Sequence, residues 1–298
     1  MSQPLDNKTA VFYGQFVQAA YKMFKDPGPD SLRPEPALIP DGWEVGAWIH
    51  MSDFVLNDKD PKFYGIVAHN LKEPDSRIIA IRGTEGAVEW IDDAAAVPVP
   101  FKQVPSAGRV SYGFDNIYSS MKVVKRRLPS EREPEAAEPE TFSGSFAEQL
   151  EQEVLRRERS RGVARAATEP RRTRPTVVTG HSLGSALATL FVLENDSKRK
   201  FDVSTLCTFA SPRVGNMEFV HVFNKLPIVS WRIVNVNDFV PKIPFHIPVL
   251  ADYGHVDTEY SFDSSKFAKK NLVCSHSMET YLHWLDPTVA VLPECAQK

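Results

Sequence analysis

The sequence predicts an α/β protein in which a mainly parallel sheet is covered by helices on both faces. Short apolar segments alternate with segments of helical periodicity along much of the chain, as a parallel sheet requires. The run from Arg77 to Arg82 is apolar between its ends, which is typical of a strand buried on both faces. A chain of 298 residues, 42% of them hydrophobic, suffices for one large α/β domain or two ordinary ones.

The other elements follow from periodicity and from the residues that interrupt it. The first helix, residues 10–24, has apolar residues at helical spacing and stops at Asp26-Pro27-Gly28-Pro29. Pro98 and Pro100 end a short amphipathic helix at Gly86–Ala96. We expect further helices at 113–124, 146–159, after Ser182 and at 278–285, and strands at 43–50, 63–69, before Gly180, at 203–210 and at 231–237.

The composition changes between residues 125 and 174, where Pro, Glu, Arg and Ser dominate. We interpret this segment as a charged, partly flexible surface insertion that contains the helix at 146–159. Its arginines are compatible with contact to anionic lipid or to a partner, but a solvated charged loop is the simpler interpretation.

Charge and cysteine content exclude several classes of protein. A net charge of -3 gives no electrostatic case for nucleic acid. Three cysteines are too few for a disulfide framework. Cys207 lies in an apolar strand, and the sequence does not decide whether Cys274 and Cys295 form a disulfide. The first residues are polar and no segment is long and apolar enough to span a bilayer. We therefore expect a soluble, cytoplasmic protein, or a secreted one if a leader has been removed.

The most informative segment is Val177–Ala188, which reads as a strand, a sharp turn and a helix. The turn has the pattern Gly-x-Ser-x-Gly, with Ser182 between Gly180 and Gly184. Such a turn is strained and crowded, so a side chain at either glycine would clash with a neighbouring strand or helix. The helix after Ser182 directs free N–H groups to the place where an oxyanion would form.

A serine hydroxyl needs a base, and the base needs an orienting carboxylate. In folds with this turn the order along the chain is Ser, then Asp or Glu, then His. Asp238 directly follows the strand at 231–237, where loops at the carboxyl ends of strands form a site. The competing carboxylates are Asp202, Asp252, Asp257 and Asp263.

His276 is the first candidate for the base because it immediately precedes the helix at 278–285. His255 is its rival, while His283 lies inside that helix and has a structural interpretation. His181, beside the nucleophile, is expected to support the turn. The oxyanion would be bound by the N–H of Leu183 and by Thr84, whose loop begins at Gly83.

A series of short motifs resembles one family in order, from about residue 60 to 285. They are Ile81-Arg82-Gly83-Thr84, Trp90-Ile91-Asp92-Asp93, Gly113-Phe114, Thr179-Gly180-His181-Ser182-Leu183-Gly184, Thr208-Phe209-Ala210-Ser211-Pro212-Arg213-Val214-Gly215-Asn216, Asn237-Asp238-Phe239-Val240-Pro241, and His276 before Tyr281-Leu282. The family is the class 3 (fungal-type) lipases of the α/β-hydrolase superfamily.

This resemblance implies an α/β-hydrolase fold and hydrolysis of carboxylic esters, which needs no metal or organic cofactor. We expect a single domain over residues 1–298. The roles that the resemblance implies are Ser182 as nucleophile, Asp238 as orienting acid, His276 as base, Thr84 and Leu183 as oxyanion donors, Gly86–Ala96 as a lid helix containing Trp90, and Asp93 as support for the oxyanion residue. The family usually has glycine where Ser185 stands, and histidine where Ser111 stands.

The substrate is the least determined property. We expect a lipase acting on acylglycerols, with lipid esters or small esters as substrates and transient contact with a lipid surface. The alternatives are a phospholipase A1, a short-chain or feruloyl-type esterase, and a catalytically silent lipase-like binding module. A further alternative is a membrane-surface protein that binds through the arginine-rich insertion.

Overall fold

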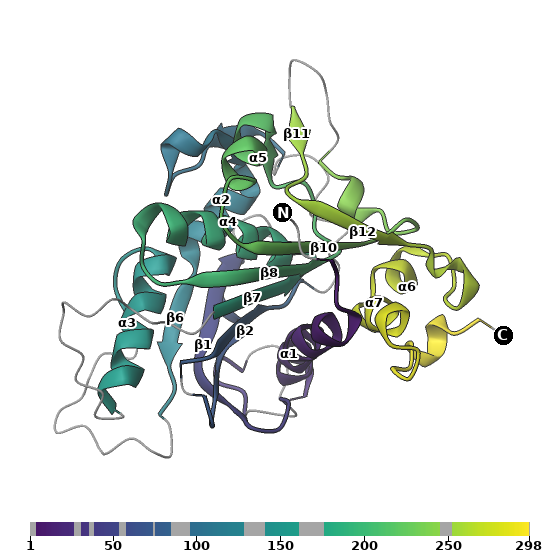
Figure 1. Cartoon of the computed structure of the whole chain (residues 1–298), viewed down its shortest axis with the longest axis horizontal. Coiled ribbons are helices and arrows are strands. Elements are labelled where there is room, and N and C mark those ends of the chain that lie inside the picture. Colours follow the sequence, from purple (N-terminus) through teal and green to yellow (C-terminus); the bar gives the residue numbers. More distant parts are fainter. Residues whose placement is uncertain are drawn as a thin grey trace.

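An eight-stranded sheet runs through the molecule with helices on both faces (Figure 1). The computed structural model describes residues 4–26, 31–35, 39–53, 58–73, 75–84, 96–127, 141–160, 176–244 and 252–297. The strands in spatial order are β12 (Thr258–Phe262), β10 (Val229–Asn235), β8 (Val203–Phe209), β7 (Thr176–His181), β3 (Arg77–Ile81), β2 (Asp58–Asn70), β1 (Trp43–Asp53) and β6 (Lys122–Lys125).

The sheet is mixed, and its parallel half is the half that prepares the site. From β12 to β3 each neighbouring pair is parallel, whereas β3, β2, β1 and β6 pair antiparallel. The carboxyl ends of β3, β7, β8 and β10 therefore lie at one edge of the sheet. Loops that leave this edge can bring distant residues together.

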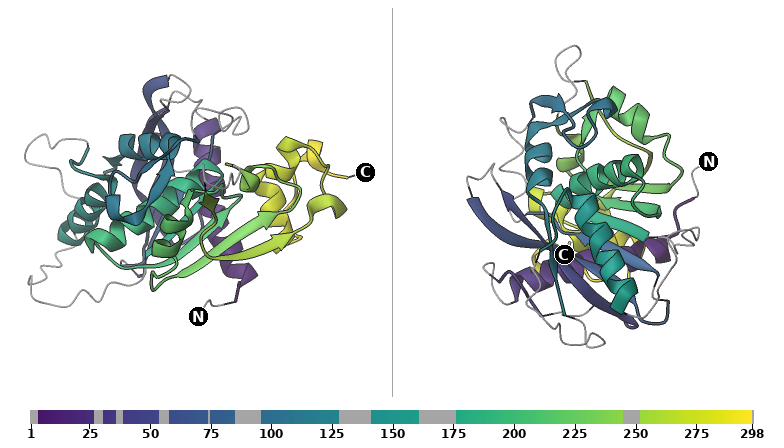
Figure 2. Two further views of the ribbon diagram at one scale, coloured as in Figure 1. Left: turned by 90° about the horizontal axis from the view of Figure 1, so that it is seen from above. Right: turned by 90° about the vertical axis from the view of Figure 1, so that its left-hand side faces the viewer.

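The helices divide between the two faces of the sheet, as the sequence predicts. Helix α1 (Asn7–Lys25) and helix α7 (Met278–Leu285) lie side by side on one face (Figures 1 and 2). The other face is covered by α2 (Tyr112–Ser120), α3 (Phe146–Ser160) and α4 (Leu183–Lys198). Alternate residues of β3 enter the two cores: Ile78 and Ala80 pack on the α1 side, and Ile79 and Ile81 on the α4 side.

A second, four-stranded sheet lies beside the carboxyl edge of the first. Its spatial order is β11, β9, β5, β4. The remaining elements are β4 (Pro98–Pro100), β5 (Arg109–Ser111), β9 (Gly215–Asn216), β11 (Tyr253–Gly254), α5 (Met217–Phe223), α6 (Leu272–His276), and the short 3-10 helices Pro105–Ala107, Val240–Lys242, Ser264–Lys266 and Pro293–Cys295.

The predicted helix at 113–124 is wrong at its C-terminal end. Helix α2 ends at Ser120, and Met121 takes an extended conformation before β6 begins. Val123 and Val124 of β6 pair with Ile49 and Trp48 of β1. Helical spacing cannot reveal this outcome, because the pairing partner lies more than seventy residues earlier in the chain.

Part of the predicted insertion at 125–174 belongs to the core. Helix α3 buries Phe146 and Leu150 among the core side chains. Its Arg157 forms an ion pair with Glu44 of β1, and its Glu158 lies 3.6 Å from Arg77 of β3. Residues 128–140 and 161–175 lie outside the described residues, so a flexible surface insertion stays a prediction for them.

The chain contains one disulfide among its described residues, between Cys274 of α6 and Cys295. The bridge ties the C-terminal segment to the element that ends at His276. The N–H of Lys269 adds a 2.9 Å hydrogen bond to the carbonyl of Cys295. Cys207 is a buried free thiol in β8, as predicted.

We predict that replacing both bridged cysteines, Cys274→Ser with Cys295→Ser, lowers the free energy of unfolding by about 3 kcal/mol. The 21-residue separation sets this size, because the bridge restricts the unfolded chain. Urea unfolding would measure the loss. A reductant should lower the stability of the wild type to that of the variant and leave the variant unchanged. Equal stability of the two oxidised proteins would contradict the prediction.

His255, between β11 and β12, is a neutral structural histidine. Its Nε2–H donates to the carbonyl of Pro241 at 2.7 Å. Burial lowers the pKa of His255 from 6.5 to about 3, and the charges of Arg232 and Arg213 act in the same direction. The folded state therefore holds this imidazole uncharged at pH values where the unfolded chain would protonate it.

The free energy of unfolding should consequently fall as the pH drops below 6.5. Protons bind the unfolded state first, so His255 alone removes about 1.4 kcal/mol per pH unit as the pH falls from 6.5 towards 3. The variant His255→Gln keeps a donor for Pro241 but cannot titrate. Urea unfolding between pH 6 and 4.5 would measure the free energy of unfolding of both proteins. Its dependence on pH should be shallower in the variant by about that amount. An unchanged slope would contradict the assignment.

Candidate active site

Ser182 occupies a tight turn between β7 and α4, at the carboxyl edge of the sheet. Its backbone has φ 57° and ψ −127°, a conformation that costs a non-glycine residue free energy and is typical of a nucleophile elbow. The side chain is fully buried. The strand, the strained turn and the helix thus succeed each other as the Gly-x-Ser-x-Gly pattern predicts.

The two glycines of the turn are required by close packing. A Cβ on Gly180 would lie 2.5 Å from the carbonyl oxygen of Gly184, and a Cβ on Gly184 would overlap the carbonyl oxygen of Ile81. Ser185 stands where the family usually has glycine, and its hydroxyl oxygen lies 2.8 Å from the carbonyl of Gly180 and 2.9 Å from that of Phe209, which share its one proton. This departure therefore adds bonds that hold the turn.

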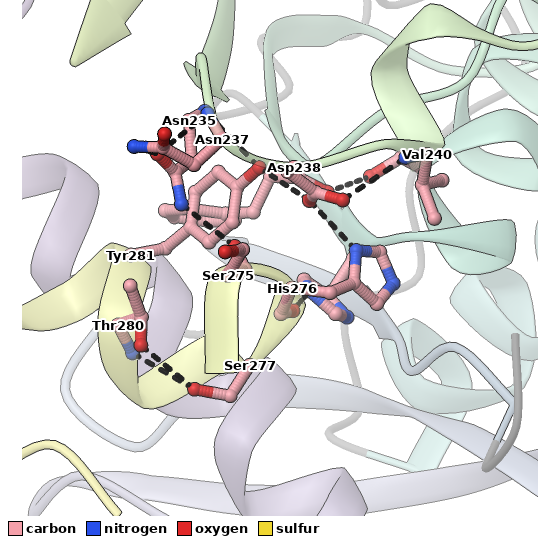
Figure 3. A network of polar contacts seen from close by, with 12 residues as sticks. Asn235, Asn237, Asp238, Val240, Ser275, His276, Ser277, Thr280 and Tyr281 are labelled. Carbon is pink, nitrogen blue, oxygen red and sulfur yellow. Dashed lines mark hydrogen bonds and ion pairs between the residues drawn. The ribbon is translucent and has the colours of Figure 1, made fainter. Parts of the chain in front are cut away.

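The structure pairs Asp238 with His276 (Figure 3). Their Oδ2 and Nδ1 atoms are 2.7 Å apart, and the Asp238 side chain is buried. Asp238 follows β10 and His276 ends α6, so the two come from separate loops at one edge of the sheet. With Nδ1–H donating to the carboxylate, the lone pair of Nε2 is left for a proton from a nucleophile.

Two further groups hold the carboxylate of Asp238, and neither was predicted from the sequence. The hydroxyl of Tyr281, on α7, donates to Oδ2 at 2.7 Å, and the N–H of Val240 donates to Oδ1 at 3.0 Å. Asn235 donates its N–H to the Tyr281 hydroxyl at 3.1 Å. A tyrosine on an otherwise apolar helix indicates a hydroxyl that needs a partner, but its spacing does not show which loop that hydroxyl faces.

Ser182 Oγ and His276 Nε2 are both buried and have no hydrogen-bond partner among the described residues. Buried polar atoms are normally paired, so an unpaired hydroxyl and an unpaired ring nitrogen at one site indicate groups kept for another purpose. Serine and base often pair fully only once substrate is bound.

The two expected oxyanion donors, Leu183 and Thr84, come from two segments that pack against each other. Leu183 is the first residue of α4, whose opening N–H groups lack helical partners. Thr84 is buried in the loop after β3. Gly83 brings that loop against the turn, since a Cβ there would lie 2.7 Å from Ser182 Cβ. Asp93, Trp90 and the predicted lid helix lie within 85–96, of which only Ala96 is among the described residues.

The rival residues have other partners. His181 donates from Nε2 to the carbonyl of His276 at 2.8 Å, and its Nδ1 lies 2.7 Å from the Tyr21 hydroxyl. Burial and the neighbouring His276 lower the pKa of His181 well below its usual value, so it supports the turn as a neutral ring. His255 is bonded to Pro241, and Asp263 accepts from the side chain of Asn237 and the N–H of Ser265.

Within the described part of the chain, no group of three histidine, cysteine, aspartate or glutamate residues is placed to hold a metal ion. None of the described helices is both long and apolar enough to cross a membrane.

Comparison with known proteins identifies relatives that are named as lipid hydrolases. Galactolipase DONGLE, chloroplastic, of Arabidopsis thaliana is 27% identical over 348 aligned residues, covering 99% of this chain and 67% of that protein. Phospholipase A1-Igamma3, chloroplastic, of the same plant is 30% identical over 241 residues, covering 70% of this chain and 42% of that protein. The chain thus spans about two fifths to two thirds of these curated relatives.

Solved structures share the fold at lower identity. The LIP2 lipase of Yarrowia lipolytica superposes with a TM-score of 0.58 at 19% identity, over 88% of this chain and 83% of that one. A deletion mutant of the Rhizomucor miehei lipase in its propeptide complex superposes with a TM-score of 0.57 at 20% identity, over 92% of this chain and 75% of that one. These likenesses confirm the predicted α/β-hydrolase fold.

The family described as Lipase (class 3) matches residues 78–247, a span that begins in β3, contains the turn at Ser182 and reaches past Asp238. Because that span is more than half of the chain, the protein belongs to the class 3 lipase family.

Proposed function

We propose that this chain is a serine hydrolase of carboxylic esters, with Ser182 as nucleophile, His276 as base and Asp238 as the carboxylate that orients it. The observation that carries the proposal is the 2.7 Å contact between the buried carboxylate of Asp238 and His276, at the same sheet edge as the strained turn of Ser182. Membership of the class 3 lipase family supports the same chemistry.

The reaction would proceed in two stages. His276 Nε2 takes the proton of Ser182 Oγ as that oxygen attacks the ester carbonyl, and the N–H groups of Leu183 and Thr84 stabilise the resulting oxyanion. His276 then returns the proton to the departing alkoxide, which leaves as the alcohol, and an acyl-enzyme remains. Water, deprotonated by His276, attacks this ester in the same way. The acid is released and Ser182 recovers its proton.

For the substrate we propose polar glycerolipids, hydrolysed at an ester of the glycerol backbone. The curated relatives are named galactolipase and phospholipase A1, and they support this class more directly than solved triacylglycerol lipases, whose low identity concerns the fold alone. Triacylglycerol is the second candidate.

Exposed apolar side chains near the site support contact with a lipid surface. Leu272 and Val273 are 52% and 67% exposed on α6, the element that ends at His276. Large apolar groups that stay in water next to a catalytic residue favour insertion at an interface.

Two of the three described arginines of α3 do not favour the alternative of a membrane protein that binds through its insertion, whereas Arg159 is exposed. Arg157 is buried in its ion pair with Glu44, and Arg156 lies 2.7 Å from Glu153. Charges used within the fold are not available to lipid headgroups.

The cytoplasmic location stays a prediction. Several relatives carry the word chloroplastic in their names. Fractionation of cells that express the tagged chain would distinguish cytoplasm from plastid.

We predict that Ser182→Ala lowers kcat by a factor on the order of a million, because the hydroxyl is the attacking group. The assay would use p-nitrophenyl esters from acetate to palmitate and vesicles of phosphatidylcholine or galactosyldiacylglycerol, with distinct acyl chains at each position. Ser204→Ala, at the opposite end of the neighbouring strand β8, is the matched control and should keep wild-type activity. A folded wild type no faster than Ser182→Ala on every substrate would leave the lipase-like binding module as the function.

We also predict that Leu272→Ser with Val273→Ser slows hydrolysis of vesicle lipid about thirtyfold, since losing part of each apolar contact costs roughly 1 kcal/mol and the pair therefore about 2 kcal/mol. Hydrolysis of soluble p-nitrophenyl butyrate should change less than twofold. Leu71→Ser, equally exposed at the far edge of the sheet, is the control. Equal effects of the two changes on vesicle lipid would argue against docking through α6.

A further inference from the structure

Tyr21 of α1 connects three separate parts of the candidate active site, although the helical pattern of its segment assigns it no role. We propose that Tyr21 is a positioning residue for the chemistry at Ser182: its hydroxyl fixes the oxyanion loop at Gly83 and the imidazole of His181 in one arrangement. The inference rests on the proposed hydrolase function and concerns a residue that does not itself touch the ester.

The hydroxyl lies at the centre of a short chain of hydrogen bonds. The N–H of Gly83 donates to Tyr21 Oη at 2.8 Å, and Tyr21 Oη lies 2.7 Å from His181 Nδ1. His181 Nε2 lies 2.8 Å from the carbonyl of His276. The loop after β3, the nucleophile turn and the base are thereby joined through a helix on one face of the sheet.

Only one arrangement of protons satisfies every group in this series of hydrogen bonds. A carbonyl can only accept, so His181 must carry its proton on Nε2. Nδ1 is then an acceptor, and the Tyr21 hydroxyl must donate to it while accepting from Gly83. Burial raises the pKa of Tyr21 and lowers that of His181, so both groups stay neutral through the working range. The direction of each bond is therefore fixed.

Arg82 holds the other side of the same loop. Its guanidinium, which lies over the rings of Phe24 and Tyr64, donates to the carbonyl of Gly83 at 2.6 Å. In a trans peptide the carbonyl and the following N–H point in opposite directions. Arg82 thus sets the direction of the Thr84 N–H, and Tyr21 fixes the preceding peptide.

The oxyanion loop packs closely against Tyr21 and the nucleophile turn at Gly83. A Cβ on Gly83 would lie 2.6 Å from Tyr21 Oη and 3.0 Å from the carbonyl of His181. Losing the Tyr21 hydroxyl would release the Gly83 N–H and leave His181 Nδ1 without its donor. Oxyanion donors act only when they are aligned beforehand, so the loss should appear in the transition state and not in ester binding.

The test compares Tyr21→Phe with Tyr13→Phe, which removes a hydroxyl from the same helix where the ring stacks on Trp231. Steady-state hydrolysis of p-nitrophenyl butyrate separates kcat from KM. We expect Tyr21→Phe to lower kcat between about tenfold and a hundredfold, less than removal of a whole oxyanion donor, with KM within twofold. Tyr13→Phe should keep the wild-type kcat.

A boronic acid that adds to Ser182 provides a readout that a purely structural role would not move. Its tetrahedral adduct resembles the oxyanion, so its inhibition constant should rise in Tyr21→Phe by about the factor that kcat loses. A fall in kcat without that rise would overturn the proposal, as would an unchanged kcat or an equal loss in Tyr13→Phe.

His181→Gln is the second variant and serves if Tyr21→Phe does not fold. It keeps an amide donor for the His276 carbonyl but not the imidazole geometry that accepts from Tyr21. It should lower kcat and raise the inhibition constant together, and combining it with Tyr21→Phe should cost less than the product of the single losses. An unchanged inhibition constant in His181→Gln would overturn the inference. A wild type that hydrolyses no ester would instead refute the proposed function.

Discussion

The strained turn at Ser182 is the constraint on which the rest of the site depends. A positive φ at a serine persists only where the surroundings enforce it. Here the N–H of Ser182 bonds the carbonyl of Phe209 at 2.9 Å, and the Ser185 hydroxyl bonds two carbonyls beneath the turn. These carbonyls belong to β7 itself and to its parallel neighbour β8, while the carbonyl of Ile81 in β3, on the other side, leaves no room for a side chain at Gly184. The order of the strands thus holds the nucleophile at the edge.

The acid and base are organised by burial. A buried carboxylate is costly unless donors surround it, and Asp238 receives bonds from His276, Tyr281 and Val240. Tyr281 belongs to α7, which packs against α1 on the same face of the sheet. The charge that orients the base is thus stabilised by a helix that also packs apolar side chains, Leu282 and Leu285 among them, into the core shared with α1.

Helix α1 contributes both to the hydrophobic core and to the candidate active site. Its apolar side chains fill the core between α7 and the sheet, while Tyr21 reaches the carboxyl edge. A helix near the start of the chain can therefore influence a nucleophile 161 positions later. This arrangement makes positioning of the oxyanion loop depend on the docking of α1, which apolar burial secures.

The sequence alone determined the features that depend on neighbours in the chain. The strand, turn and helix around Ser182 are local, so spacing and two glycines predicted them, and the alternation of strands and helices predicted the fold. It also marked Asp238 and His276 as candidates by position. Only the tertiary structure decided which carboxylate meets which histidine, that Val123 and Val124 extend the sheet, that Cys274 joins Cys295, and that Tyr21 and Tyr281 face the site. Each of these is a contact between segments far apart in sequence, and local spacing carries no information about the packing that brings them together.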